Sequence, residues 1–242
     1  MKIKKSIIFL AVIGVVLAVL CSCSVQSSKS NFEKVMSLPG TIADEAYDAY
    51  IFADLNDYEQ YCRDRNLDYS FLKGKVVKTE YHVCFDKEDM LFRGYTLVTF
   101  SVEKSTGSLL KKGDVITLGQ DSYVQFKNDA DAYRYLTGKT AESPEEMNSE
   151  LGKTDDIDKV LVFQNGVEYI RRTRGFEVPM KEGETYTMVA YKLDGKDTYG
   201  YNFALPGDSL VAEFRDRYGT PFSGSYYSIA NEIRSKIKNL DF

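Results

Sequence analysis

The single histidine of the 242-residue chain, His82, stands two residues before Cys84, and such a pair is a first candidate for nucleophilic catalysis. A thiol nucleophile needs a base within hydrogen-bond reach, about 3 Å. The surrounding residues alternate in polarity, which predicts a strand, and side chains at i and i+2 of a strand stand roughly 6–7 Å apart on one face. We therefore expect no direct His82–Cys84 contact. We also expect His82, which shares its face with Lys78 and Glu80, to be solvated and not catalytic.

Acidic residues form three short groups whose spacing matches no metal site. Calcium loops place acids at set intervals, with a glycine for the turn and a late glutamate, and transition metals favour clustered histidine and cysteine. We therefore predict no metal and no cofactor. Paired carboxylates can also hydrolyse glycosidic bonds, so a carboxylate-dependent envelope or glycan hydrolase is the alternative to a non-catalytic protein. The three groups are Asp54/Asn56/Asp57, Asp129/Asp131 and Asp155/Asp156/Asp158.

The only basic run of the sequence is Arg171-Arg172-Thr173-Arg174. On a strand, Arg172 and Arg174 would share a face and could grip a carboxylate, a phosphate or a sulfated sugar. The alternative is an edge strand that its charges protect against unwanted pairing.

Tyrosine is abundant, at 18 residues, and two pairs are candidates for ligand contact. Tyr199 and Tyr201 alternate on one predicted strand, and Tyr226 and Tyr227 precede the last predicted helix. Exposed rings can stack on sugars or pack against a protein, whereas buried rings serve the core, because tyrosine covers apolar area well.

A period of two predicts the strands that must position these residues. The first runs from Lys75, and its inner face consists of Val77, Thr79, Tyr81, Val83 and Phe85. The second has Thr96, Val98, Phe100 and Val102 on its inner face. A third covers 115–126 with an interruption near Gly119, and a later pair covers 185–193 and 199–205. Asn165-Gly166 is typical of a tight hairpin, here joining 160–163 to 167–173.

Helical periodicity predicts three further regions. Leu55, Tyr58, Tyr61 and Cys62 form one stripe of a helix that Asp54 or Asp57 could cap, so Cys62 should face the core. Residues 128–156 are polar and acidic, with a helix start at Ser143-Pro144, and we interpret them as a helical insertion. A C-terminal helix at about 228–240 should pack its stripe of isoleucines across the sheet.

The N-terminus has the three parts of a secretory signal. Lys2, Lys4 and Lys5 precede an apolar run of 14 residues at 7–20, which is short for a spanning helix of about 20 residues. A retained membrane anchor is the alternative. The following Leu20-Cys21-Ser22-Cys23 resembles the lipobox of bacterial lipoproteins. The resemblance implies that residues 1–22 are removed and that Cys23 carries the lipid.

The anchor prediction changes how the rest of the chain is interpreted. Ser24 to Pro39 is rich in serine and lysine and is interpreted as a flexible tether, so that 23–39 leads to a single β-rich domain at 40–242. Outside the cytoplasm, Cys62 and Cys84 could form a disulfide; the alternative is two free thiols. Removal of three lysines leaves 28 basic and 36 acidic residues, a net charge of −8. Nucleic acid is therefore an unsuitable partner.

Three strands, a helical insertion and further strands follow the order of an OB-like open barrel. The layout resembles a group of bacterial lipoproteins with an OB-like domain and no assigned function, over roughly residues 70–206. The carrying segments are Gly74-Lys-Val-Val77, Lys112-Gly-Asp114 and Lys181-Glu-Gly-Glu-Thr-Tyr186. The fold class is thus mainly β (β-rich α+β), with an immunoglobulin-like sandwich as the competing architecture. The expected function is non-catalytic binding of an envelope protein or glycan at the cell membrane, outside the cytoplasm.

Overall fold

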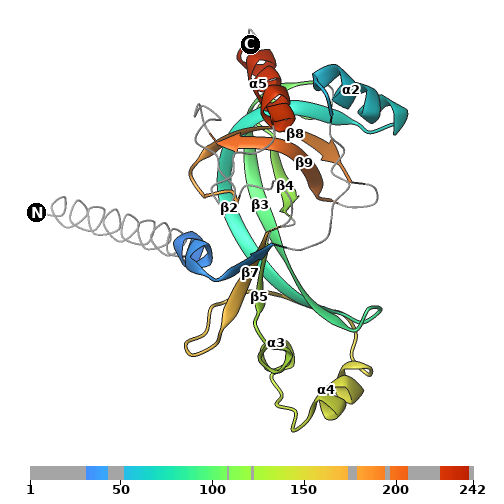
Figure 1. Cartoon of the computed structure of the whole chain (residues 1–242), viewed down its shortest axis with the longest axis vertical. Helices are drawn as coiled ribbons and strands as arrows, with labels where there is room; N and C mark the ends of the chain where they lie inside the picture. The colour runs from blue at the N-terminus through green and yellow to red at the C-terminus, as the bar shows by residue number, and fades with distance from the viewer. Residues whose placement is uncertain are drawn as a thin grey trace, which may run out of the picture. The chain divides into compact units, whose positions relative to one another are not determined.

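The computed structural model describes residues 31–42, 52–107, 109–120, 123–173, 179–193, 197–206 and 224–239. These residues are mainly β, as predicted, with a six-stranded mixed sheet, a three-stranded sheet and a few helices (Figure 1). The chain divides into two units, residues 1–37 and 38–242, and both sheets belong to the second. None of the helices in the described segments is long and apolar enough to cross a membrane.

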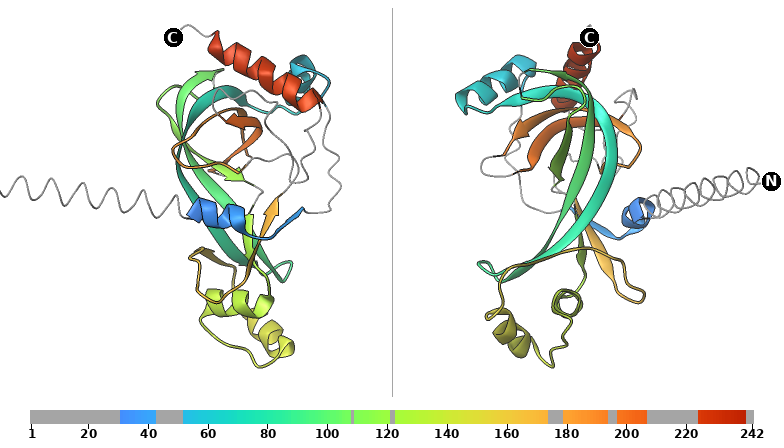
Figure 2. Two further views of the ribbon diagram at one scale, coloured as in Figure 1. Left: turned by 60° about the vertical axis from the view of Figure 1, so that its left-hand side comes forward. Right: turned by 180° about the vertical axis from the view of Figure 1, so that it is seen from behind.

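Helices lie at both ends of a long β2–β3 hairpin. Figures 1 and 2 show α2 and α5 near one end of this hairpin and α3 and α4 near the other. The elements, in chain order, are β1 (Gly40–Ile42), α2 (Leu55–Asp64), β2 (Tyr69–Asp86), β3 (Leu91–Thr106), β4 (Val115–Gln120), β5 (Tyr123–Phe126), α3 (Asp129–Thr137), α4 (Pro144–Leu151), β6 (Ile157–Val160), β7 (Tyr169–Thr173), β8 (Thr185–Lys192), β9 (Tyr199–Pro206) and α5 (Gly224–Lys238).

The six-stranded sheet contains a closed ring of strand pairings. Its order is β3-β4-β9-β8-β2-β6, and β2 also pairs with β3. The five strands β2, β3, β4, β9 and β8 therefore form a closed ring, and β6 lies outside it. The β4–β9 pairing is parallel and the others in the ring are antiparallel. Apolar side chains from all five strands make one buried cluster, which includes Leu72, Val98, Phe100, Leu118, Met188 and Ala204.

A β-bulge in β2 explains one error of the sequence prediction. The register with β3 shifts between Val76 and Lys78, which leaves Val77 as an extra residue. Because side chains alternate along a strand, one extra residue exchanges the two faces. Val76 is therefore buried and Val77, predicted to face inward, is 55% exposed.

The two segments that carry Lys112-Gly-Asp114 and Lys181-Glu-Gly-Glu184 make the same turn. Gly113 donates its N–H to the carbonyl of Val102, and Gly183 donates to Val76, both at 2.9 Å. In each case the valine N–H donates to the carbonyl of the residue after the glycine, which is Asp114 for Val102 and Glu184 for Val76, also at 2.9 Å. Both glycines have positive φ, 92° and 81°, a conformation that glycine adopts without steric cost. The first turn thus attaches the start of β4 to β3, and the second attaches the start of β8 to β2.

The predicted helical insertion contains α3 and α4, and Ser143 caps α4 with Pro144 in its first turn, as predicted. The prediction of a hairpin across Asn165-Gly166 was wrong. The chain turns there, with Gly166 at φ 77°, but β6 pairs with β2, whereas β7 pairs with β5 and β1. The segment 115–126 likewise supplies two strands, β4 and β5, to two different sheets.

Helices α2 and α5 cover the outside of the ring at one end, where they form a second buried cluster with β8 and β9. Asp54 caps α2, and Leu55, Tyr58 and Cys62 are buried, as the periodicity predicted. Helix α5 buries Ile229, Ile233 and Ile237 and begins at Gly224, before the predicted start.

Residues 31–37 are helical, which corrects part of the predicted flexible tether. The segment just after them is also ordered: Pro39 accepts the N–H of Arg171, and β1 pairs in parallel with β7. Residues 23–30, with Cys23, lie outside the described residues.

Candidate functional site

A polar network lies on the outward face of β6, β2 and β3, near the free end of the hairpin. The Nδ1 of His82 is 2.9 Å from the Oδ1 of Asp158, and the hydroxyl of Tyr95 donates to Asp158 Oδ2. The rings of His82 and Tyr95 stack, with centroids 4.6 Å apart and planes 16° from parallel. Because a carboxylate only accepts hydrogen bonds, the Nδ1 of His82 carries the hydrogen.

Strand register brings these three side chains together. His82 stands opposite Tyr95 on β3 and opposite Val160 on β6, while Cys84 stands opposite Arg93 and Asp158. Directly opposed residues share a face of the sheet. We call this outward surface the arm face; it consists of His82, Cys84, Leu91, Arg93, Tyr95, Asp158 and Val160.

The expectation that His82 is solvated was wrong. Its side chain is only 14% exposed, and its Nε2 atom is buried without a hydrogen-bond partner among the described residues. The reason is the cross-strand arrangement: Tyr95 covers one face of the ring and Asp158 binds its edge. As expected, Cys84 does not bind the Nδ1 atom of His82, because Asp158 is the hydrogen-bond partner there.

The electrostatic surroundings keep the thiol and the phenol of the arm face protonated. Burial raises the pKa of the Cys84 thiol, and the negative charge of Asp158 raises it further. Burial also raises the pKa of Tyr95 well above its usual value, and the hydrogen bond to Asp158 adds to this effect. Since the thiolate is the nucleophilic form of cysteine, the arrangement opposes nucleophilic catalysis by Cys84.

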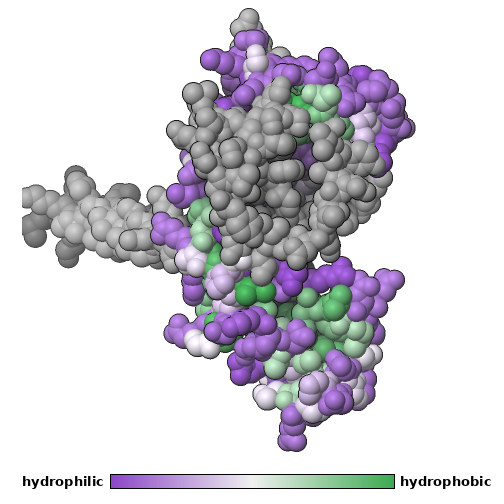
Figure 3. Space-filling view, viewed as in Figure 1, coloured by the Kyte–Doolittle hydropathy of each residue, from purple (hydrophilic) through white to green (hydrophobic). Residues whose placement is uncertain are grey.

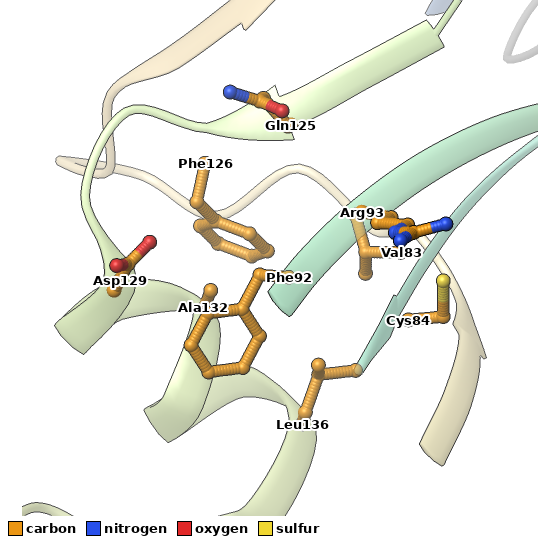
Figure 4. A pocket seen from close by; sticks show the side chains of 9 residues that line it. All are labelled: Val83, Cys84, Phe92, Arg93, Gln125, Phe126, Asp129, Ala132 and Leu136. Atoms are coloured by element: carbon orange, nitrogen blue, oxygen red, sulfur yellow. The ribbon is translucent and has the colours of Figure 1, made fainter. Parts of the chain in front are cut away.

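A small pocket adjoins the arm face where the hairpin meets α3 and β5. In Figure 4, Phe92 and Phe126 lie at its centre, while Cys84 and Arg93 lie together on the side away from Asp129. Its volume is about 30 Å³, whereas small-molecule sites usually measure about 300–1,000 Å³. The pocket can therefore hold a water molecule or two, and it is too small for a metabolite.

Arg172 lies on β7, half-buried, and Arg174 lies outside the described residues. The idea that charge protects an edge strand does not fit β7, because β7 is the central strand of the three-stranded sheet β1-β7-β5. The short strand β1, which the sequence did not reveal, covers its second edge. Whether Arg172 and Arg174 grip an anion stays a prediction.

The candidate tyrosines do not gather on one described surface. Tyr199 and Tyr201 are partly buried and pack against the core of the ring, and the ammonium of Lys192 lies 4.5 Å from the centre of the Tyr199 ring. Tyr226 and Tyr227 belong to the first turns of α5, and their side chains lie outside the described structure.

Cys62 and Cys84 were expected either to form a disulfide or to remain free thiols, and in the structure both are free. Cys62 packs in the cluster beneath α2, together with Phe71 of β2. Phe71 and Cys84 are 13 residues apart on β2 (84 minus 71), which corresponds to about 40 Å of strand at about 3.3 Å a residue. A disulfide needs Cα atoms within about 7 Å.

Sequence reasoning missed Asp158 and Tyr95 as partners of His82. Their sequence separations from His82 are 76 and 13 residues, and only the strand register joins them. In the described part of the chain no group of three or more His, Cys, Asp or Glu residues is placed to hold a metal ion. No family model, no curated protein and no solved structure matches this chain.

Proposed function

We propose that this chain is a lipid-anchored bacterial envelope protein, held through Cys23, whose OB-like domain binds an envelope protein partner through the arm face. The observation that carries the binding proposal is the composition and exposure of the arm face. The anchor rests on the sequence Leu20-Cys21-Ser22-Cys23 at the end of an apolar run.

The anchor is tested with two single substitutions. Cys23→Ala should release the protein from membranes, because acyl chains hold a protein by burying methylene groups. Cys21→Ala is the matched control and should leave the protein in the membrane fraction. Membrane retention of Cys23→Ala equal to that of the unmodified sequence would contradict the anchor.

Three features of the strand arrangement support an OB-like barrel over an immunoglobulin-like sandwich. Five strands that pair in a closed circuit correspond to a small barrel, and the insertion between β4 and β8 contains α3 and α4. The parallel pairing of β4 with β9 also differs from the antiparallel pairing on which such a sandwich is built.

The arm face has the side chains that favour protein recognition. Interfaces are enriched in tyrosine and arginine, and the centre of an interface is more apolar than the rest of the protein surface. The arm face combines Tyr95 and Arg93 with two exposed apolar residues, Leu91 at 52% and Val160 at 46%. Figure 3 shows apolar surface gathered around this end of the β2–β3 hairpin and α3. Leu91 stands opposite Asp86 at one end of the arm face, and Val160 stands opposite His82 at the other. Since single exposed apolar residues are normal, the argument depends on their combination with Tyr95 and Arg93.

Photo-crosslinking in intact cells tests the arm face. A benzophenone amino acid at position 91 should give a discrete protein adduct, identified by mass spectrometry. The control is the same substitution at Val115, which is 64% exposed on β4. The same adducts from both positions, or none from position 91, would contradict the proposal. Binding of a purified cell-wall glycan without a protein adduct would favour a glycan partner.

The hydrolase alternative would need acids that are free to exchange protons. Both oxygens of Asp158 accept hydrogen bonds, and Asp156 accepts the N–H of Lys87 at 2.9 Å. These carboxylates therefore hold β6 against the hairpin. Glycan hydrolysis by the full chain that is lost in Asp158→Asn would favour the hydrolase over binding.

A further inference from the structure

Strand β6 is an edge of the six-stranded sheet, and in the described residues it pairs with β2 alone. The N–H of Leu161 donates to the carbonyl of Tyr81 at 2.7 Å, so the backbone groups of the preceding residue, Val160, point away from β2. The chain exposes Val160 by 46% and Val162 by 66% on this edge. An exposed apolar edge is a template for pairing with another strand.

The hydroxyl of Tyr135, on α3, occupies this edge as a neighbouring strand would. It donates to the carbonyl of Val160 at 2.7 Å and accepts the N–H of Val162 at 2.9 Å. A single side chain thus satisfies one outward acceptor and one outward donor. The ring of Tyr135 is held separately, against Phe126, with centroids 5.2 Å apart.

We propose that Tyr135 masks a strand-pairing edge, and that the partner which fits this edge is β6 of a second copy of the chain. In an antiparallel pairing centred on Val160, this residue faces its own copy, Asp158 faces Val162, and Lys159 faces Leu161. No two like charges stand opposite one another, whereas opposed like charges destabilise a sheet. The two exposed valines would become covered, and all outward backbone groups of the strand would gain partners.

A second copy must compete with an internal hydroxyl that is always within reach. The masked state therefore prevails while Tyr135 is in place, and removal of its oxygen shifts the balance toward pairing. Tyr135→Phe keeps the ring on Phe126 and removes only the oxygen. It leaves the carbonyl of Val160 and the N–H of Val162 open to an incoming strand.

The test is disulfide trapping with the full-length chain. In the centred pairing, the two copies of residue 160 form a hydrogen-bonded pair with Cα atoms about 5.5 Å apart, within the range of about 4.4–6.8 Å for a disulfide. The Val160→Cys chain should give at least tenfold more cross-linked dimer when it also carries Tyr135→Phe. Val162→Cys, which would face Asp158, should cross-link far less in the same background.

Tyr169→Phe is the matched control for loss of a tyrosine oxygen. The hydroxyl of Tyr169 accepts the N–H of Gln164 at 2.9 Å, and Gln164 lies beyond residues 158–162, which pair in the centred register. Combined with Val160→Cys, it should leave the dimer yield unchanged. The proposal is overturned if Tyr135→Phe does not raise cross-linking at position 160. It is equally overturned if Tyr169→Phe raises cross-linking as much, or if positions 160 and 162 cross-link alike.

Discussion

The Nδ1 of His82 and the Oδ1 of Asp158 are 2.9 Å apart, although 76 residues separate the two in sequence. The contact joins the hairpin to β6, which follows directly on the helical insertion. Because Asp158 also accepts the hydroxyl of Tyr95, one carboxylate connects three strands. The network therefore holds the end of the insertion in place and shapes the arm face.

Replacing Asp158 by Asn should destabilise the domain by on the order of 1 kcal/mol, because one of its two acceptor oxygens becomes a donor. The effect is modest because the Asp158 side chain is 49% exposed and solvent screens it. Urea unfolding at neutral pH measures the change. Asp155→Asn is the control, since the Asp155 side chain is fully exposed, and its stability should not change. Equal stability of the two variants would contradict the structural role of Asp158.

The bulge in β2 predicts opposite outcomes at two neighbouring valines. Val76→Ala should cost about 2 kcal/mol, because it leaves a cavity in the core of the ring. Val77→Ala should change the free energy of unfolding by less than about 0.5 kcal/mol, as exposed positions usually do. Chemical denaturation of both variants checks this, and a larger loss at Val77 would place the bulge elsewhere.

Local patterns predicted the individual elements well. The stripe of Leu55, Tyr58 and Cys62, the cap at Ser143 and the inner face of β3 all depend on neighbours in sequence, so period and capping chemistry reveal them. The β-bulge escaped prediction because Val76 and Val77 are chemically identical. Only the pairing with β3 decides which of the two is buried.

Pairing between distant strands could not be predicted in the same way. Asn165-Gly166 makes the expected turn, yet the strands on its two sides join different sheets, because β2 and β5 offer other edges. The same limit applies to the site: the neighbours of His82 in sequence suggested a solvated ring, and its partners came from β3 and β6. The anchor at Cys23 rests on sequence alone, since it lies outside the described residues.

Gly94 on β3 should tolerate no side chain. A Cβ there would meet the carbonyl of Val124 and lie 2.6 Å from the ring of Tyr123, so β5 could not pack on the hairpin. Gly94→Ala should cost about 2 kcal/mol or more, as overpacking does. Gly119→Ala on β4 is the control, because a Cβ there would meet nothing within 4 Å. Thermal unfolding of both variants makes the comparison, and equal melting temperatures would show that β5 moves freely.

Stability should fall steeply in alkali because buried phenols resist ionisation. Burial raises the pKa of Tyr58 far above its usual value, and burial likewise raises that of Tyr186. In the unfolded chain both ionise near pH ~10. Their contribution is therefore complete below about pH 10 and is lost as the pH rises from there toward the raised values of the folded state. Urea unfolding from pH 8 to 11.5, with phenolate absorbance recorded in parallel, measures the decline.

Tyr58→Phe separates this effect from general alkaline instability. The substitution removes the hydroxyl that accepts a hydrogen bond from Asn202 at 3.1 Å, so stability at pH 8 should fall by about 1 kcal/mol. Above pH 10 the stability of the variant should fall less steeply with pH than that of the unmodified sequence. The reason is that the variant lacks the Tyr58 phenol, which ionises in the unfolded state but stays protonated in the folded state. An unchanged slope would mean that Tyr58 ionises as readily in the folded protein as in the unfolded chain. Its hydroxyl would then be accessible to solvent instead of buried between α2 and Asn202 of β9.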